Sequence, residues 1–92
     1  MTLEQLRERI DRLDQRLLEL LNRPARLAIQ VGRLKRQQGK RLFDPKRERA
    51  ILLRMTRTNG GPLSSEAVRA IYRDILTQIR RLEHRNFASR NF

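Results

Sequence analysis

Apolar residues in the first 38 positions recur at alternating steps of four and three, which places them on one face of a helix. The positions of this seam are Leu3, Arg7, Ile10, Asp14, Leu17, Leu21, Pro24, Ala28, Val31 and Lys35. Thr2 and Gln5 have the spacing of a capping box at its start, and Gly39 is a typical terminator at its end. The pattern therefore predicts one helix from about residue 3 to residue 38.

Two shorter helices are predicted in the rest of the chain. Asp44-Pro45 is typical of an N-cap followed by proline in the first turn, and it opens a helix that ends near Thr58. The turn-forming run 59–62 separates this helix from a third one. We expect the third helix to begin at a cap on Ser64 or Ser65 and to end at residue 84 or 85.

The first helix is too long for the other two to cover. A helix of about 36 residues spans roughly 54 Å, whereas the shorter helices contain about 14 and 20 residues, and so small a domain buries little apolar surface by itself. A second copy of the chain is the simplest cover for the seam. We therefore expect an all-α, intertwined homodimeric bundle of three helices per chain, formed by residues 1–85, with residues 86–92 as a frayed tail.

The composition limits the kinds of site that the chain can carry. It has no cysteine, which excludes disulfides and thiolate metal sites, and its single histidine, His84, cannot form a metal site alone. The first segment is charged and amphipathic, and no apolar run approaches membrane-spanning length. These features predict a cytoplasmic protein without a signal peptide, a membrane contact or a metal.

The chain is strongly basic, with 22 Lys and Arg against 10 Asp and Glu and a net charge of +12. Such a surface attracts anions that range from nucleic acids to small dicarboxylates. The cations are spread along the chain in runs no longer than two, and the few aromatic residues form no evident stacking surface for single strands. Charge alone leaves nucleic-acid binding open as an alternative function.

Four charged residues lie on the apolar stripes of the predicted helices. Arg7 and Lys35 lie on the first seam, while Glu48 and Glu83 follow the stripes of the second and third helices. A buried charge is costly unless it is paired or lines a polar cavity. Salt bridges or snorkelling at helix ends explain each residue singly, but two cations and two carboxyls from three helices also fit a polar pocket.

Five segments occur in order along the chain: Leu6-Arg7-Glu8-Arg9-Ile10-Asp11, Leu17-Leu18-Glu19-Leu20-Leu21-Asn22, Val31-Gly32-Arg33-Leu34-Lys35, Asp44-Pro45-Lys46-Arg47-Glu48, and Gly61-Pro62-Leu63-Ser64 leading to Leu82-Glu83. Together they resemble the all-helical class of chorismate mutases, including those fused to prephenate dehydratase. The resemblance covers residues 3–85. It implies an isomerase of phenylalanine and tyrosine biosynthesis that rearranges chorismate to prephenate as a homodimer, without a cofactor and without a specific nucleic-acid partner.

The resemblance also implies a role for each charged position. Arg7 would bind a substrate carboxylate in the partner's site, and Lys35 would contact the ether oxygen and a carboxylate. Glu83 would be the second donor to the ether oxygen. The other implied substrate contacts are Asp44 and Glu48, which would hold the substrate hydroxyl, and Arg47 beside them.

The chemistry of the reaction explains these residue types. A Claisen rearrangement takes place within one molecule, so the enzyme needs no nucleophile or cofactor but must hold a folded dianion. Negative charge develops on the ether oxygen as its bond to carbon breaks, and donors placed there stabilise the transition state. A carboxyl at position 83 can donate only when it is protonated.

Two positions depart from the family. Pro24 stands where the family has an arginine that binds a substrate carboxylate, and the neighbouring Arg23 points about 100° away on a helix. Proline inside a helix removes one backbone hydrogen bond, at a cost of roughly 3 kcal/mol, and predicts a kink over residues 20–24. Ile79 stands where the family often has serine.

Three explanations of Pro24 are open: a substitution in an otherwise ordinary enzyme, a natural member whose site has drifted from mutase activity, or a local error of alignment. The sequence thus predicts a chorismate mutase whose activity Pro24 could weaken. The alternatives are a non-catalytic dimeric module of the same fold and a basic nucleic-acid-binding helical protein. The scaffold is also compatible with pyruvate elimination from isochorismate, and with either a free-standing enzyme or one domain of a larger protein.

Overall fold

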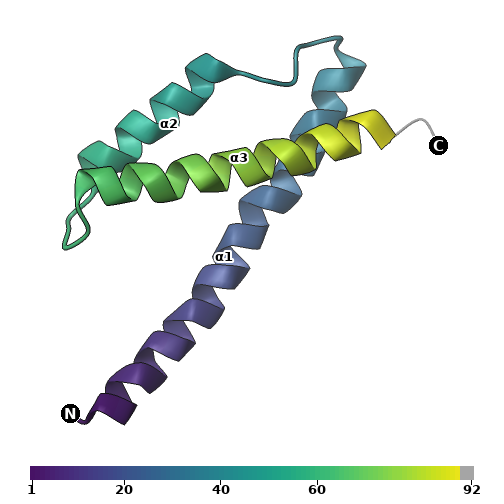
Figure 1. The fold of residues 1–92 in the computed structure, drawn as a ribbon. Coiled ribbons are helices and arrows are strands. Elements are labelled where there is room, and N and C mark those ends of the chain that lie inside the picture. Colours follow the sequence, from purple (N-terminus) through teal and green to yellow (C-terminus); the bar gives the residue numbers. More distant parts are fainter. Residues whose placement is uncertain (90–92) are drawn as a thin grey trace.

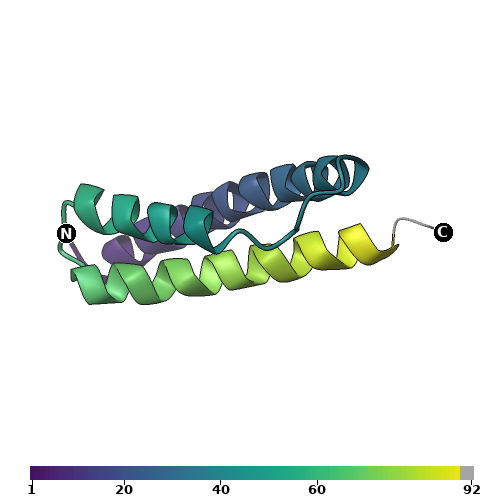
Figure 2. The same ribbon diagram turned by 90° about the horizontal axis from the view of Figure 1, so that it is seen from above.

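The computed structural model describes residues 1–89, and the side chains of residues 1–86. This part of the chain folds into three helices and contains no strand: α1 over Leu3–Gln37, α2 over Pro45–Thr58 and α3 over Ser65–Ser89. The helices α2 and α3 form an antiparallel pair, and α1 crosses α3 obliquely (Figures 1 and 2). The prediction of an all-α chain is confirmed for these residues.

The helix starts, and the turn after α1, form where the sequence places their caps. The backbone N–H of Gln5 donates to Thr2 Oγ1 at 3.1 Å and the backbone N–H of Thr2 donates to Gln5 Oε1 at 2.9 Å, so the predicted capping box is present. After α1 the chain turns at Gly39, whose φ of +65° is a left-handed conformation that favours glycine. At the start of α3 the Ser64 hydroxyl accepts a hydrogen bond from the backbone N–H of Ala67 at 3.1 Å.

Pro24 does not interrupt α1, and the kink over residues 20–24 stays a prediction. The helix runs unbroken from Leu3 to Gln37, and its ribbon continues past the crossing with α3 (Figure 1). Pro24 and Leu20 are both exposed in the single chain, so water can hydrate the Leu20 carbonyl that has lost its N–H partner.

The third helix continues beyond its predicted end. It reaches Ser89 instead of residue 84 or 85, and the Asn86 amide donates to the carbonyl oxygen of Leu82 at 2.9 Å within its last turns. Residues 86–89 contain no glycine or proline that would stop a helix. Part of the predicted tail is therefore helical, and residues 90–92 lie outside the described residues.

The single chain has an open shape with little interior. Its principal extents are 55 × 29 × 14 Å and its radius of gyration is 16.6 Å, against about 12 Å for a compact domain of this length. Ala28 and Val68 are the buried apolar residues of the described part, in which no large side chain is fully buried. What packing there is lies between α1 and α3 and between α2 and α3.

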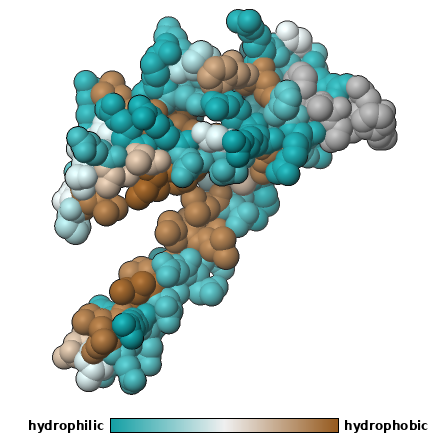
Figure 3. Space-filling model, in the orientation of Figure 1, coloured by the Kyte–Doolittle hydropathy of each residue, from teal (hydrophilic) through white to brown (hydrophobic). Residues whose placement is uncertain are grey.

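The first half of α1 extends away from the other helices with its apolar face uncovered (Figures 1 and 3). We call this surface the exposed seam; its residues are 46 to 63 % exposed and comprise Leu3, Leu6, Ile10, Leu13, Leu17 and Leu20. Monomeric proteins rarely leave so continuous an apolar surface in water. The exposed seam is the surface for which the sequence predicts a second copy of the chain.

None of the helices in the described residues combines the length and the apolar character needed to cross a membrane. Location in the cytoplasm stays a prediction.

Candidate active site

A cavity of about 340 Å³ lies where α1, α2 and α3 meet the segment that joins α1 to α2. Its volume falls within the range that is usual for small-molecule sites. The cavity is lined by residues from all four segments: Pro24, Leu27, Ala28, Val31, Lys35, Leu42, Asp44, Arg47, Glu48, Ile51, Leu76, Ile79, Arg80 and Glu83. Five of the six predicted site residues therefore share one cavity, and the sixth, Arg7, does not line it.

Lys35 and Glu83 meet across the crossing of α1 and α3. The Lys35 ammonium donates to the carbonyl oxygen of Leu42 at 2.8 Å and lies 3.5 Å from Glu83 Oε1. The two side chains are only 23 % and 12 % exposed, respectively. The ammonium is thus fixed at the cavity wall by one backbone acceptor and one carboxyl, and it still has donor capacity for a ligand.

The close approach of α1 and α3 at this point depends on Gly32, which is buried. A Cβ atom at position 32 would lie 3.0 Å from Glu83 Cγ and 3.3 Å from the Glu83 carbonyl oxygen. Any side chain there would therefore push Glu83 away from its present position. Gly32 contributes to the site by leaving room for Glu83 beside Lys35.

The start of α2 supplies the next group of site residues. Asp44 is the N-cap of α2, and its Oδ1 accepts a hydrogen bond from the backbone N–H of Arg47 at 3.0 Å. The Asp44 carboxylate is thereby held at the cavity by its capping role. The side chain of Arg47 is exposed and also lines the cavity, so it provides a positive charge near the solvent side.

Glu48 has a partner that the sequence reading missed. Arg80 Nη1 donates to both carboxylate oxygens of Glu48, at 2.8 and 2.9 Å, and the guanidinium lies 4.6 Å from the centre of the Phe43 ring. The sequence does contain a signal for Arg80. It follows Leu76 by four positions and precedes Glu83 by three, so helical spacing places all three residues on one face of the helix. The apolar stripe through Ile79 does not include the adjacent position 80.

Position 24 lies on the cavity wall, as expected for the alignment, but proline offers no charge there. Arg23 does not replace it, because it lines a separate hollow on the surface of α1 with Leu18, Glu19, Asn22 and Arg26. Ile79, the milder departure, also lines the cavity and makes that wall apolar. In the single chain the cationic side chains of the cavity are therefore Lys35, Arg47 and Arg80.

Arg7 lies on the exposed first half of α1 and is far from the cavity of its own chain. It precedes Lys35 by 28 positions on one helix, which corresponds to about 42 Å at 1.5 Å per residue. An arginine side chain cannot span that distance. Arg7 can therefore take part in such a cavity only in another copy of the chain.

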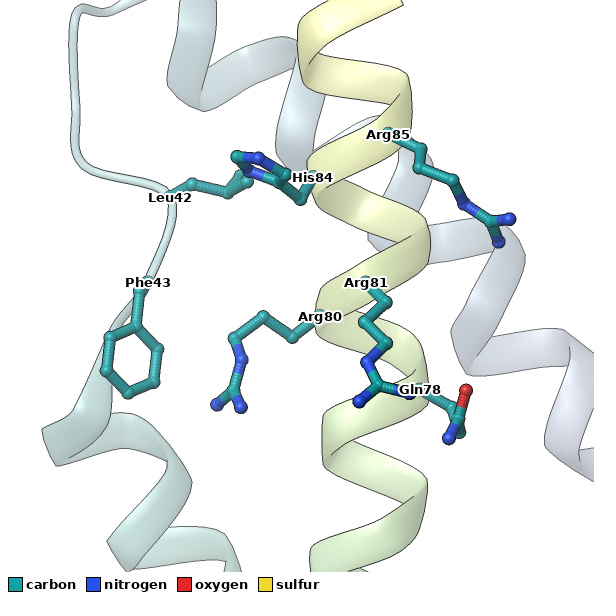
Figure 4. Close-up of a pocket in the computed structure, with 7 residues that line it drawn as sticks. All are labelled: Leu42, Phe43, Gln78, Arg80, Arg81, His84 and Arg85. Atoms are coloured by element: carbon teal, nitrogen blue, oxygen red, sulfur yellow. The ribbon is translucent and has the colours of Figure 1, made fainter.

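A second, more open hollow of about 780 Å³ adjoins the cavity on the outer side of α3. Its residues are Leu42, Phe43, Gln78, Arg80, Arg81, His84 and Arg85, and Figure 4 shows Arg80 reaching from α3 towards Phe43 while Arg81 and Arg85 point away from that ring. Arg80 is one of two residues that line both spaces, with Leu42. The guanidinium of Arg80 therefore stands at the boundary between the cavity and the outer hollow.

Comparison with known proteins places the chain in a family. Residues 6–84 match the model of chorismate mutase type II. The chain belongs to this family. The predicted resemblance is thereby confirmed over the part of the chain that contains all the residues of the cavity.

The curated relatives of this chorismate mutase family member are larger proteins. It is 39 % identical over 85 residues to the bifunctional chorismate mutase/prephenate dehydratase of Aquifex aeolicus and 38 % identical over 86 residues to that of Pseudomonas aeruginosa. These alignments cover 88 % of this chain and 24 % of each relative. The chain thus spans about a quarter of the length of these relatives.

Solved structures similar to this chain are of comparable size. Chorismate mutase (Form II) of Thermus thermophilus matches with a TM-score of 0.87 and 35 % identity, over 89 % of this chain and 93 % of that one. Chorismate mutase of Helicobacter pylori, solved in complex with prephenate, matches with a TM-score of 0.85 and 29 % identity, over 95 % and 94 % of the two chains. The fold is thus that of chorismate mutases over nearly the whole chain.

Proposed function

We propose that this chain is a chorismate mutase, an isomerase that converts chorismate to prephenate in the biosynthesis of phenylalanine and tyrosine. The observation that carries the proposal is the pair of Lys35 and Glu83 in a cavity between three helices, in a chain that belongs to the chorismate mutase type II family. Prephenate, the product, is the ligand named for the similar Helicobacter pylori structure. A cavity with cations and carboxyls on apolar walls suits such a dicarboxylate.

In the proposed reaction the ether C–O bond of chorismate breaks and a new C–C bond forms within the same molecule. No group leaves and no proton is transferred, so the residues bind, orient and stabilise charge. Lys35 donates to the ether oxygen, where negative charge develops, and also pairs with a substrate carboxylate. Glu83 in its protonated form is the second donor to that oxygen.

The start of α2 would bind the hydroxyl end of the substrate. Asp44 and Glu48 line one side of the cavity with acceptor oxygens, and Arg47 adds a cation there. Each oxygen of the Glu48 carboxylate accepts one hydrogen bond from Arg80 and retains capacity for a second. The substrate hydroxyl can therefore donate to Glu48 without displacing Arg80.

The active form would be a homodimer in which α1 of each copy lies along the other. Its support is the exposed seam, together with the position of Arg7 at the far end of α1. A second copy would cover the seam and bring its own Arg7 to the cavity of the first. Each site would then combine Lys35 of one chain with an arginine of the other.

The test is the loss of chorismate and the appearance of prephenate in a reaction with the purified chain. Lys35→Ala should lower kcat/KM by about 10² to 10³, because it removes a donor to the charge that develops in the transition state. Lys40→Ala is the matched control: it removes the same charge from an exposed position outside the cavity, and should leave kcat/KM within a factor of about two. A parent protein without turnover, or equal losses in the two variants, would contradict the proposal. Release of pyruvate from isochorismate would instead indicate the related elimination.

A further inference from the structure

Arg80 is the best-positioned guanidinium in the cavity. One of its terminal nitrogens, Nη1, donates hydrogen bonds to both carboxylate oxygens of Glu48. The Cζ atom of its guanidinium lies 4.6 Å from the centre of the Phe43 ring. An arginine held by a carboxylate and an aromatic ring loses little side-chain freedom when it binds a further group. Arg47, the other arginine of the cavity, is exposed, and its hydrogen bond to Asp44 is made by its backbone N–H and not by its guanidinium.

The edge of Arg80 that is not used by Glu48 has the geometry of a carboxylate-binding site. A guanidinium has five N–H donors in a fixed plane, and Glu48 accepts only from Nη1. Among the described residues, none accepts a hydrogen bond from Nε or Nη2. These two nitrogens form the parallel pair of donors that binds a carboxylate in a bidentate manner.

The charges that line the cavity show that a dicarboxylate would need a second cation besides Lys35. Three cations line it, but Lys35 is already engaged by Glu83 and by the Leu42 carbonyl, and three carboxyls oppose them. The α1 wall has Pro24 and apolar residues facing the cavity, so it offers no second cation of its own. A dicarboxylate in the cavity needs a cation for the carboxylate that Lys35 does not hold.

We propose that Arg80 binds a carboxylate of the substrate through its Nε and Nη2 edge, with Glu48 and Phe43 as its positioning residues. This inference rests on the proposed function, because it takes the ligand to be a dicarboxylate such as chorismate. Arg80 then supplies from α3 the positive charge that α1 does not supply at Pro24. With proline at position 24, the site would still have a cation for each carboxylate of the substrate, because Arg80 supplies the one that α1 lacks.

The experiment compares Arg80→Gln with Arg81→Gln. Both remove one positive charge from α3, but Arg81 lines only the outer hollow and does not line the cavity. We expect Arg80→Gln to raise KM for chorismate and Kd for prephenate by about 30-fold, as the loss of hydrogen bonds to a charged group does. Arg81→Gln should change neither by more than about two-fold. Equal effects of the two variants would overturn the proposal.

A double-mutant cycle separates substrate binding from a structural role. If Arg80 acts only by holding Glu48, then Arg80→Gln should weaken prephenate binding no further once Glu48→Gln is present. Direct contact with the carboxylate predicts that Arg80→Gln still weakens prephenate binding by about 10-fold or more in the Glu48→Gln background. Calorimetry with prephenate gives both values without the need for turnover.

The outcomes distinguish this proposal from the proposed function. Turnover of chorismate that is unaffected by Arg80→Gln overturns the role of Arg80 and leaves the reaction in place. Prephenate binding that depends on Arg80, in a parent protein that does not convert chorismate, overturns the reaction and supports the binding role. A parent protein that neither binds prephenate nor converts chorismate overturns both.

Discussion

Lys35 Nζ and Glu83 Oε1 lie 3.5 Å apart across the crossing of α1 and α3, and they belong to residues 48 positions apart in the sequence. Both side chains line the cavity and are mostly shielded from solvent. The pairing brings one permanent donor and one carboxyl to a single point of the wall. Several properties of the protein depend on this arrangement.

Glu83→Gln and Glu83→Ala should have opposite effects on the reaction. An amide at position 83 can donate a hydrogen bond to the ether oxygen, whereas the methyl group of alanine donates none. We therefore expect Glu83→Gln to keep kcat/KM at or above that of the parent, and Glu83→Ala to lower it by about 10². Glu66→Gln, in the exposed first turn of α3, is the control and should leave kcat/KM unchanged. Equal losses in Glu83→Gln and Glu83→Ala would show that Glu83 is not a donor in the reaction.

Gly32→Ala should impair catalysis more than folding. The new methyl group would lie 3.0 Å from Glu83 Cγ and 3.3 Å from the Glu83 carbonyl oxygen, so Glu83 must move relative to Lys35. The shift needed is a few tenths of an ångström, and because a displacement of about 1 Å can cost about 10²-fold in rate, we expect kcat/KM to fall by up to about 10-fold. Gly60→Ala meets no atom within 4 Å and should leave kcat/KM unchanged. Equal kinetics for the two variants would contradict the positioning role of Gly32.

Substitutions at Pro24 should separate the backbone effect from the charge effect. Pro24→Ala restores the backbone donor to the Leu20 carbonyl and should raise Tm by several degrees without a large change in kcat/KM. Pro24→Arg should raise Tm as well, and because it adds a cation to the cavity wall it should increase kcat/KM by about 10-fold. In an Arg80→Gln background the gain from Pro24→Arg should be larger, about 10² or more, since the two arginines supply the same kind of contact. An equal gain in kcat/KM from Pro24→Arg in the parent and in Arg80→Gln would show that the two arginines do not supply the same contact.

The exposed seam predicts a dimer. Sedimentation of the purified chain, whose mass is 11.0 kDa, should give twice that mass at micromolar concentration, because apolar side chains over the first half of α1 have no cover within one chain. Leu17→Glu places a charge on the seam and should shift the equilibrium to monomer and unfolded chain. Gln15→Glu adds the same charge on the opposite face of α1 and should keep the dimer. A folded, stable monomer of the parent would contradict this architecture.

Much of the fold could be read from the sequence because its signals are local. Thr2 with Gln5 and Asp44 with Pro45 fix helix starts through hydrogen bonds within four residues, and glycines fix the turns. The end of α3 was placed too early, because no breaker marks it and periodicity fades gradually. The sequence also places Pro24 inside α1, and the helix continues on both sides of it because proline removes only one backbone hydrogen bond there.

The site was predicted in part. Charges on apolar stripes identified Lys35, Glu48 and Glu83, since those positions are set by helical spacing alone. Arg80 was missed because its role depends on a partner 32 positions away on another helix, and on Phe43 in a connecting segment. The close approach at Gly32 is likewise a property of how α1 and α3 cross. Contacts between different helices cannot be predicted from the spacing of apolar residues along a single helix.

The most direct test of the account is complementation between two inactive variants. Arg7→Ala and Lys35→Ala should each be nearly inactive alone, because every site would lack one of the two cations. When the two are unfolded together and refolded as a 1:1 mixture, half of the dimers are mixed, and each mixed dimer has one site with both residues intact. The mixture should therefore recover about a quarter of the parent kcat with an unchanged KM for chorismate. Activity no greater than the mean of the separate variants would contradict a catalytic site formed by Lys35 of one chain and Arg7 of another.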